Sequence, residues 1–378
     1  MKKLLSCLLA LLALTALSPS AAAEDLAVDA QSCLLMEKTT GQVLYAVNEH
    51  EPLEPASVTK VMTILLVMEA IDAGTLRYDD VVTASAYACS MGGSQIWLKE
   101  NEQMTVQDML KAVCVASAND CSVALAEHIA GSADAFVEKM NQRAKELGMN
   151  DTHFVNPTGL PAEGHLTSAY DIALMSRELI LHHPDVRKFT TIWMDTLRNG
   201  AFGLSNTNKL IRYYEGATGL KTGSTDGALY CLSATAERDG MELIAVVLKS
   251  PTGTQRFESA KVLLNYGFAA YGLTTVEPPT PLQPIPVALG EAGSVLPRLE
   301  GTNTLLLAKE QLSGLEVQVQ LEETLPAPVE AGQRVGQLTV TSGGKTLAEL
   351  ALVADCSVAR LSYWQILQRC LKTAFLAG

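Results

Sequence analysis

The sequence has little basic charge, few aromatic residues and no confident membrane-spanning run. Its 378 residues include 28 lysines and arginines against 41 aspartates and glutamates, so the net charge is −13, and aromatics make up only 5%. This acidic balance argues against a nucleic-acid partner. The apolar run at residues 4–17 is too short for a confident membrane span. What is present is an ordinary globular composition, with 48% hydrophobic residues and a length that allows two domains.

Metal-binding and histidine-based catalytic patterns are also missing. No Gly-x-Ser-x-Gly motif indicates a histidine-based triad. The cysteines show no metal-ligand spacing, so we interpret them as small buried hydrophobic residues, and the sequence reveals no disulfide pairing. The sequence therefore predicts neither a metal nor a cofactor. The histidines form no metal-binding pair, and we interpret all six as structural: His50, His128, His153, His165, His182 and His183.

Residues 1–23 have the pattern of an export signal. Lys2 and Lys3 precede the apolar run, and four small residues come before Glu24. This order predicts a signal peptide that is cleaved after Ala23, so the mature protein is exported. Cys7 is a poor match to a lipoprotein cleavage box because it stands before the apolar run, not at its end. Cleavage leaves seven cysteines, an odd number, so at least one is unpaired.

Residues 24–275 are predicted to form one mixed α/β domain with a helical insert. A hairpin is expected at residues 33–36 and 43–47, and strands are expected at 220–224, 228–236 and 243–249. Strands at both ends around a block of helices suggest a single domain. The helices are expected to begin near Ser57 and to cover residues 105–129, 133–147, 168–181 and 257–271.

The remainder of the chain changes in composition twice. Residues 276–286 are rich in proline and predict a stiff extended linker. Residues 287–354 are predicted to form a small all-β domain, because apolar residues alternate with polar ones at 315–321 and two strands flank Gly343-Gly344 as a hairpin.

The last segment, residues 355–378, predicts an amphipathic helix on a membrane surface. Arg360, Arg369 and Lys372 are its only charges after Asp355, which suits an anionic membrane. A helix packed back on the β domain is the alternative. Apolar residues recur there at three- and four-residue steps: Val358, Leu361, Trp364, Leu367, Leu371, Ala374 and Phe375.

The most informative stretch is Ser57-Val58-Thr59-Lys60, at the start of an apolar helix. A lysine buried there without a partner would lose hydration or give up its proton, and a neutral lysine beside a serine is a base beside a nucleophile. Alone, the motif is weak: a helix cap with a snorkelling lysine explains it better, and Ser342-Gly343-Gly344-Lys345 repeats the pattern in a predicted turn.

Two further motifs follow in order. Ser117-Ala118-Asn119 lies 60 residues after Ser57, and Lys221-Thr222-Gly223 lies a further 104 residues on, at a predicted strand. Individually they could be a helix break and a strand entering a turn. Together with Ser-x-x-Lys they form the set shared by penicillin-binding proteins and class A β-lactamases.

The chain resembles the serine-type D-alanyl-D-alanine carboxypeptidases among the low-molecular-mass penicillin-binding proteins. The resemblance covers almost all of the mature chain and includes "SMGGSQIWL", "SANDCSVALAEHIAGS", "FVNPTGL", "GLKTGSTDGALYCLSATAERDGMELIAVVL", "QRFESAKVLLNYGF" and "GSVLPRLEGTNTLLL". It implies a mixed α+β catalytic domain of the β-lactamase/transpeptidase type with a helical subdomain, followed by the small all-β domain. Two positions depart from the family: Ser224 replaces a frequent histidine, and Ala118 stands inside the second motif.

Roles for the first two motifs follow from chemistry and from the resemblance. Ser57 at a helix N-terminus is the predicted acyl-ester nucleophile, and Lys60 is the general base. Burial and a second cation, Lys221, would both lower the pKa of Lys60. The resemblance assigns Ser117 to proton relay, and the Asn119 carboxamide could hold both Lys60 and the substrate's amide carbonyl.

The third motif is assigned to substrate binding. Lys221 and Thr222 would bind the terminal carboxylate of the substrate, and Gly223 lets the backbone approach closely. The resemblance adds Arg256 near that carboxylate. The backbone N–H groups of Ser57 and Ser224 would form the oxyanion hole.

The resemblance implies an enzyme that removes the terminal D-alanine from peptidoglycan stem peptides ending in D-Ala-D-Ala. It also implies acylation by β-lactams and a place on the outer face of the cytoplasmic membrane, held by the C-terminal helix. Two alternatives remain: a β-lactamase, which in class A needs a glutamate-held water, and a penicillin-binding sensor. The loop at residues 150–164 has Glu163 as its only glutamate. The sequence does not distinguish monomeric precursor from cross-linked wall as substrate.

Overall fold

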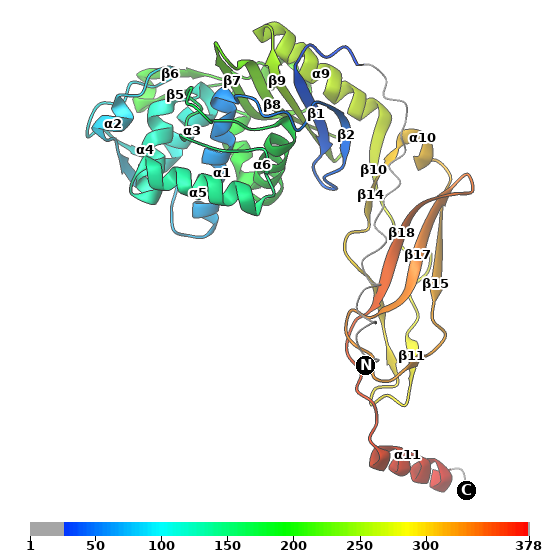
Figure 1. Cartoon of the computed structure of the whole chain (residues 1–378). Coiled ribbons are helices and arrows are strands. Elements are labelled where there is room, and N and C mark those ends of the chain that lie inside the picture. The colour runs from blue at the N-terminus through cyan, green and yellow to red at the C-terminus, as the bar shows by residue number, and fades with distance from the viewer. Residues whose placement is uncertain (1–25, 377–378) are drawn as a thin grey trace, which may run out of the picture.

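The computed structural model describes residues 26–376, and the side chains of residues 26–371 (Figure 1). The predicted signal peptide, with Cys7, lies outside the described residues. Figure 1 shows a catalytic domain of helices and sheet, from which an elongated β domain extends and ends in helix α11. The chain is thus a mixed α/β protein with a separate all-β part, as the sequence predicts.

One antiparallel sheet organises the catalytic domain. Its strand order is β2-β1-β9-β8-β7, with β1 (Ser32–Glu37) and β2 (Val43–Val47) forming the predicted N-terminal hairpin. The other strands are β7 (Ala217–Thr225), β8 (Leu229–Arg238) and β9 (Met241–Ser250). Asp239 and Gly240 both have positive φ in the tight turn between β8 and β9, as a two-residue hairpin requires. The predicted hairpins are confirmed.

Helices cover both faces of this sheet. Helix α9 (Gly253–Ala270) packs on β8 and β9, and α6 (Ala169–His182) packs on β1 and β9. Around α1 (Lys60–Asp72), which is buried over most of its length, lie α3 (Val106–Ala116), α4 (Asn119–Ala130) and α5 (Ala133–Glu146). The central helix of the insert therefore starts at the edge of the sheet that carries β7.

The single helix predicted for residues 105–129 is wrong, because α3 ends at Ala116 and α4 begins at Asn119. Ser117 between them has left-handed backbone angles, φ 62° and ψ 32°, which no helix continues. The Asn119 N–H group bonds to the Ser94 carbonyl, so a contact from a distant loop replaces the helical hydrogen bond. Tertiary structure makes this break.

Several short elements have no clear sequence signal. They are single turns and two-stranded ribbons, and tertiary contacts hold them where local propensity does not. These elements are α2 (Ala86–Cys89), α7 (Arg187–Thr190), α8 (Leu210–Tyr213), β3 (Val81–Thr83), β4 (Gln103–Thr105), β5 (Met194–Leu197) and β6 (Phe202–Ser205).

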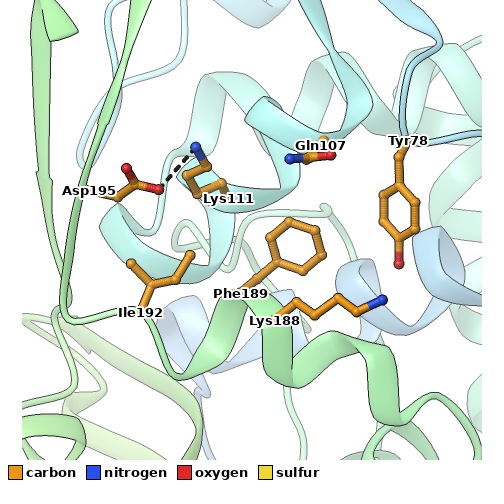
Figure 2. A pocket seen from close by; sticks show the side chains of 7 residues that line it. All are labelled: Tyr78, Gln107, Lys111, Lys188, Phe189, Ile192 and Asp195. Atoms are coloured by element: carbon orange, nitrogen blue, oxygen red, sulfur yellow. Dashed lines mark ion pairs between the residues drawn. The ribbon is translucent and has the colours of Figure 1, made fainter.

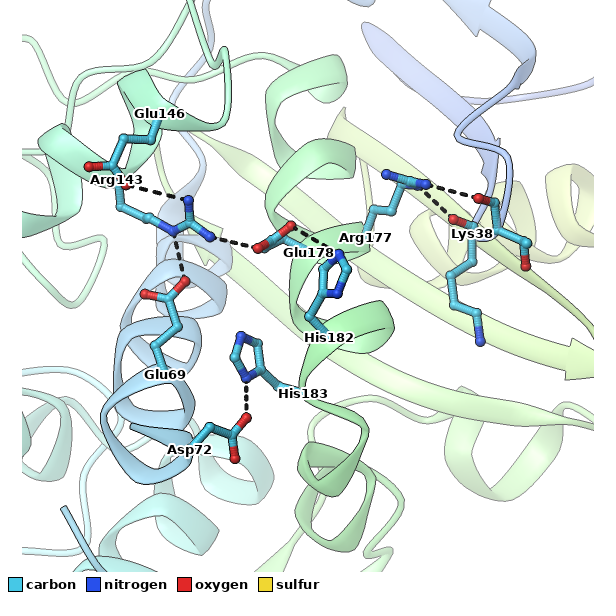
Figure 3. A network of polar contacts seen from close by, with 10 residues as sticks. Lys38, Glu69, Asp72, Arg143, Glu146, Arg177, Glu178, His182 and His183 are labelled. Atoms are coloured by element: carbon cyan, nitrogen blue, oxygen red, sulfur yellow. Dashed lines mark hydrogen bonds and ion pairs between the residues drawn. The ribbon is translucent and has the colours of Figure 1, made fainter. Parts of the chain in front are cut away.

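A polar network joins the helices at the end of α1 that lies away from the sheet edge (Figure 3). Arg143 on α5 contacts Glu69 on α1 at 2.7 Å and Glu178 on α6 at 2.6 Å. His183 Nδ1 lies 2.5 Å from Asp72 Oδ2. Glu69, Glu178 and His183 have ligand atoms close enough to hold a metal, but the Arg143 guanidinium already forms ion pairs with both glutamates. We interpret the network as a clamp between helices.

The β domain is built on a four-stranded sheet with the order β13-β18-β17-β15. Gly343 and Gly344 have positive φ in the turn between β17 and β18, as the sequence predicts for a hairpin. Four short strands, three of them in a second sheet and one paired with β10, and one helical turn complete the domain. The bounds are β11 (Ile285–Ala288), β12 (Ser294–Val295), β13 (Pro297–Leu299), β14 (Thr304–Ala308), α10 (Lys309–Leu312), β15 (Leu315–Leu321), β16 (Leu325–Pro326), β17 (Arg334–Ser342) and β18 (Lys345–Ala354).

The segment that connects the catalytic domain to the β domain is held by contacts with the β domain. Strand β10 (Tyr271–Thr275), which follows α9, pairs with β14 of the β domain. Val276 and Ile285, at the two ends of the proline-rich segment, are buried against β-domain residues. The segment predicted as a stiff linker is therefore anchored at both ends.

Helix α11 (Tyr363–Leu376) begins later than the sequence predicts. Val358 and Leu361, the first two residues of the predicted stripe, are buried, and their N–H groups bond to Val329 and Leu289 of the β domain. The residues before Tyr363 thus complete the β domain and do not belong to the helix. Within residues 26–376, no helix combines the length and the apolar character needed to cross a membrane.

The seven cysteines of the described chain are free. The interpretation as buried hydrophobic residues is confirmed for Cys33, Cys114, Cys121 and Cys231. It is wrong for Cys356 and Cys370, which are exposed near the C-terminus.

Candidate active site

Ser57 and Lys60 meet at the start of α1. A short 3₁₀ turn, Ala56–Thr59, carries Ser57, and Lys60 is the first residue of α1. Lys60 is 0% exposed, and its Nζ lies 2.9 Å from Ser57 Oγ and donates to the Thr158 carbonyl at 2.6 Å. Since no carboxylate of residues 26–371 forms an ion pair with Lys60, burial makes its charged form costly.

Burial is the main cause that lowers the pKa of Lys60 well below 10.5, and the nearby charge of Lys221 lowers it further. The Asp120 carboxylate opposes both effects but does not outweigh them. The pKa of Lys221 itself falls to about 7, chiefly through burial; a Coulombic interaction with Cys114 acts in the opposite direction, and the charge of Arg256 adds to the fall. Both causes expected from the sequence for Lys60 are therefore present.

The carbonyl partner of Lys60 comes from a loop that the motifs do not reveal. Asn156 Oδ1 accepts from the N–H groups of Thr158 and Gly159 and shapes the turn. A side chain on Gly159, which has φ +79°, would come within 1.8 Å of the Ala56 carbonyl oxygen. Glycine is required there because the loop lies directly on the turn that carries Ser57. The "FVNPTGL" segment contained this signal, but its contact with Lys60 did not follow from it.

His165 supports the same loop from behind. Its Nδ1 accepts from the Val155 N–H group at 3.0 Å, so its Nε2 carries the proton and donates to Thr59 Oγ1 at 2.8 Å. Burial lowers the pKa of His165 to about 4, with smaller contributions from His153 and Lys60. This histidine is neutral and structural, as the sequence predicts for all six.

Ser117 and Asn119 lie buried at the break between α3 and α4. Asn119 Nδ2 donates to the Gly92 carbonyl at 2.7 Å, and a side chain on Gly93 would come within 3.0 Å of that nitrogen. Ser117 Oγ and Asn119 Oδ1 are buried and have no hydrogen-bond partner in the described chain. The hydrogen bonds of Lys60 in the described chain go to Ser57 and Thr158, and its predicted contact with Asn119 stays a prediction. These two unpaired oxygens are therefore available to form hydrogen bonds with a ligand.

Strand β7 forms the opposite wall. Lys221 Nζ donates to the Thr222 carbonyl at 2.8 Å, and Thr222 Oγ1 donates to Thr207 Oγ1 at 2.7 Å. A side chain on Gly223 would come within 2.9 Å of the Ser57 nitrogen, so glycine permits the strand to pass this close to the turn. Ser224 is exposed at the end of the wall.

Arg256 lies behind this wall on α9. Its Nη1 donates to the carbonyls of Gly223 and Cys231, and its guanidinium stacks over Phe257 and Tyr230. Burial lowers its pKa to about 10. Because Arg256 has no ion-pair partner within residues 26–371, its positive charge remains uncompensated beside the strand that carries Lys221.

The arrangement is suited to activating an oxygen nucleophile. An uncharged amine beside the Ser57 hydroxyl can accept its proton, and the lysine and arginine at β7 favour a ligand with a carboxylate. A separate pocket of about 330 Å³, near Lys111 and Phe189, contains none of the motif residues (Figure 2). Lys111 pairs with Asp195 across it at 3.0 Å, so the two charges neutralise each other. The chemistry belongs to the Ser57 cleft.

Comparison with known proteins covers both parts of the chain. The sequence model described as D-alanyl-D-alanine carboxypeptidase (Peptidase_S11) matches residues 18–252, and that of the penicillin-binding protein 5 C-terminal domain matches residues 287–360. The D-alanyl-D-alanine carboxypeptidase DacF of Bacillus subtilis (strain 168) is 41% identical over 98% of each chain.

Solved structures agree with this. Penicillin-binding protein 5 of Haemophilus influenzae superposes with a TM-score of 0.80 at 31% identity and covers 88% of this chain and 98% of its own. Penicillin-binding protein D2 of Listeria monocytogenes, solved in an ampicillin-bound form, gives a TM-score of 0.60 at 34% identity, over 65% of this chain and 100% of its own.

Proposed function

Since the chain belongs to the family of serine-type D-alanyl-D-alanine carboxypeptidases, we propose that Ser57 is the nucleophile with which it removes the terminal D-alanine from peptidoglycan stem peptides. The observation that carries this proposal is the buried Lys60 amine, 2.9 Å from Ser57 Oγ and without a carboxylate partner within residues 26–371. A lysine in this state is a base, not an ion-pair partner.

The reaction has two halves. Ser57 Oγ attacks the carbonyl carbon between the two D-alanines, and its proton passes to Lys60 Nζ. The C–N bond then breaks, and Lys60 passes its proton by way of Ser117 Oγ to the leaving D-alanine amine. Water then attacks the ester carbonyl and gives its proton to Lys60, which returns a proton to Ser57 Oγ as the ester C–O bond breaks. The backbone N–H groups of Ser57 and Ser224 stabilise the negative oxygen in both halves.

The residues that bind the substrate lie on β7 and at the break between α3 and α4. Lys221 and Thr222 bind the terminal carboxylate, and the uncompensated charge of Arg256 strengthens this end of the cleft. Asn119 holds the substrate's amide carbonyl through its amide N–H, while its free Oδ1 can accept from a peptide N–H group.

The same serine is expected to react with β-lactams, which carry an amide and a carboxylate in a similar arrangement. Deacylation by a glutamate-held water, as in class A β-lactamases, has no support in the loop at residues 150–164. There the group that faces Lys60 is the Thr158 carbonyl, and Glu163 is exposed to solvent. We therefore favour a carboxypeptidase that is inhibited by β-lactams over a β-lactamase.

The test is steady release of D-alanine from a pentapeptide ending in D-Ala-D-Ala by the purified mature protein. We expect many turnovers per molecule and complete inhibition by penicillin. A single stoichiometric acylation without continued release would instead indicate a penicillin-binding sensor.

We also propose that residues 1–23 are removed on export and that α11 binds the outer face of the cytoplasmic membrane. Tyr363 and Trp364 are 75% and 70% exposed, and Leu367 and Leu371 lie one and two turns further on with 38% and 49% exposure. Arg369 donates to the carbonyls of Gly290 and Glu291, which holds the helix near the tip of the β domain. Exposed aromatic and leucine side chains on one helix suit a membrane interface.

Removal of α11 tests this proposal. Because Val358 and Leu361 belong to the β domain, the chain should be ended after Ser362, not after Ala354. We expect the shortened protein to keep its activity on small peptides and to lose binding to anionic vesicles, which the full mature chain binds more weakly as salt rises. Equal vesicle binding by both proteins would contradict a membrane role.

A further inference from the structure

Beside the active-site cleft, the described structure has an exposed aromatic platform to which neither the three motifs nor the proposed reaction assigns a function. Trp97 is 64% exposed, although its neighbours Ile96 and Leu98 are buried. Its ring meets Phe202 edge to face, with centroids 5.8 Å apart, and Arg198 lies over the Phe202 ring at 5.4 Å. The platform borders a groove of about 640 Å³.

The platform is built from two separate segments that both begin at the active site. The Ser94 carbonyl accepts a hydrogen bond from the Asn119 N–H group. Trp97 follows Ser94 by three residues, so the Cα atoms of Ser94 and Trp97 are at most about 11 Å apart. On the other side, Thr207 accepts from Thr222, and Phe202 precedes it by five residues in strand β6. Both parts of the platform are therefore only a few residues from contacts with Asn119 and Thr222.

The backbone at Trp97 has an unfavourable conformation. Trp97 has φ +54° and Arg198 has φ +52°, both in the left-handed region that non-glycine residues avoid. Asp120, next to Asn119, accepts from the N–H groups of Ile96 and Leu98 on either side of Trp97. Observed strain of this kind beside an active site points to a function of the strained residue.

Arg198 joins the two segments. It donates to the carbonyls of Ile96 and Trp97 and forms an ion pair with Glu102 at 2.7 Å. The positive charge of Arg198 is thus paired with Glu102 within the platform. The exposed surface is aromatic and apolar, and polar groups such as Lys99 and Glu100 lie at the rim of the groove.

From this geometry we propose that Trp97 and Phe202 form a subsite for the sugar rings of the peptidoglycan substrate, whose stem peptide occupies the cleft. A pyranose ring has an apolar C–H face that stacks on aromatic rings and a rim of hydroxyl groups that bonds to polar side chains. This inference rests on the proposed carboxypeptidase function, because the sugar is covalently attached to the peptide that Ser57 cleaves.

The experiment compares one pentapeptide ending in D-Ala-D-Ala with the same pentapeptide attached to its disaccharide, and measures kcat/KM for D-alanine release from each. In Trp97→Ala we expect kcat/KM for the disaccharide substrate to fall about tenfold, and kcat/KM for the free peptide to stay within about twofold. Trp97→Tyr should restore most of the loss because it restores an aromatic face.

Tyr213→Ala is the matched control, since Tyr213 is similarly exposed at 66% but lies on α8, outside the residues that line the groove. It should leave both values unchanged. An equal loss on both substrates in Trp97→Ala would show that Trp97 only supports the cleft, and no loss on either would show that the platform binds no sugar; both results overturn the subsite. A wild-type protein that hydrolyses neither substrate overturns the proposed function, and the subsite with it.

Discussion

The chain contains the Ser-x-x-Lys pattern twice, and the two copies differ in almost every physical respect. Ser57 and Lys60 are joined across one helical turn, and Lys60 is fully buried. Ser342 and Lys345 face each other across the β17–β18 turn, where Lys345 is exposed and the only hydrogen bond of Ser342 Oγ within the described chain is a long one, 3.4 Å to the Ser313 carbonyl. The first pair lies at the start of α1 inside the catalytic domain, and the second lies on a solvent-facing hairpin of the β domain.

The comparison shows that the chemistry comes from the surroundings of the motif. Lys60 loses its charge because burial removes water and Lys221 adds repulsion. Lys345 is exposed on its hairpin and has no such burial. The following variants compare the two copies, from the largest expected effect to the smallest.

Substitution of the two serines should give the largest contrast. Ser57→Ala removes the nucleophile, so we expect D-alanine release to fall at least about 10³-fold and labelling by fluorescent penicillin to disappear. Ser342→Ala should change neither, and circular dichroism should show both variants folded. Covalent labelling that survives in Ser57→Ala would rule out Ser57 as the acylated residue.

Substitution of the two lysines separates base from charge. Lys60→Arg places a permanent positive charge at this position and cannot accept a proton, so acylation should slow by about 10²- to 10³-fold. Lys345→Arg should have no effect. The rate of penicillin acylation is the measurement, and a near-normal rate in Lys60→Arg would leave Lys60 with only an electrostatic role.

The pH dependence of acylation should follow the same lysine. The base must be neutral, and the neutral fraction of Lys60 rises about tenfold per pH unit until the pH passes its lowered pKa. The rate should therefore rise with pH on the acid side. Above about pH 7, Lys221 loses its proton and binds the carboxylate less well, so the rate should fall again. Lys345→Gln should show the wild-type profile, whereas a flat profile in the wild type would contradict a neutral Lys60.

Glycines near the two motifs should differ in stability. Gly159→Ala places a side chain against the Ala56 carbonyl at φ +79°, and we expect a loss on the order of 3 kcal/mol in the catalytic domain. Gly344→Ala also strains a positive φ, but no atom lies within 4 Å, so a loss of about 1 kcal/mol confined to the β domain is expected.

The temperature at which penicillin labelling is lost reports on the catalytic domain alone. It should fall clearly in Gly159→Ala and stay constant in Gly344→Ala. Similar midpoints in the two variants would mean that the Thr158 loop does not support the Ser57 turn.

Much of this molecule was predictable because the signals are local. The turn at Asp239-Gly240 and the Gly343-Gly344 hairpin depend on backbone angles that few residues adopt. Helix caps such as Thr105, which accepts from the Asp108 N–H group, involve partners three residues apart. The three motifs and their order could also be recognised from the sequence, since they are defined by residue types and not by tertiary contacts.

The sequence alone thus determined the fold class, the hairpins and the set of reactive side chains. Only the tertiary structure decided how they meet: the Thr158 carbonyl reaches Lys60 from 98 positions away, and the Ser94 carbonyl ends a helix that local propensity would continue through Ser117. It also buried Val358 in the β domain, although the spacing placed it on a helix. Contacts of this kind form only when distant segments pack together, because a polar group that loses its water on burial then gains from a hydrogen bond within the protein.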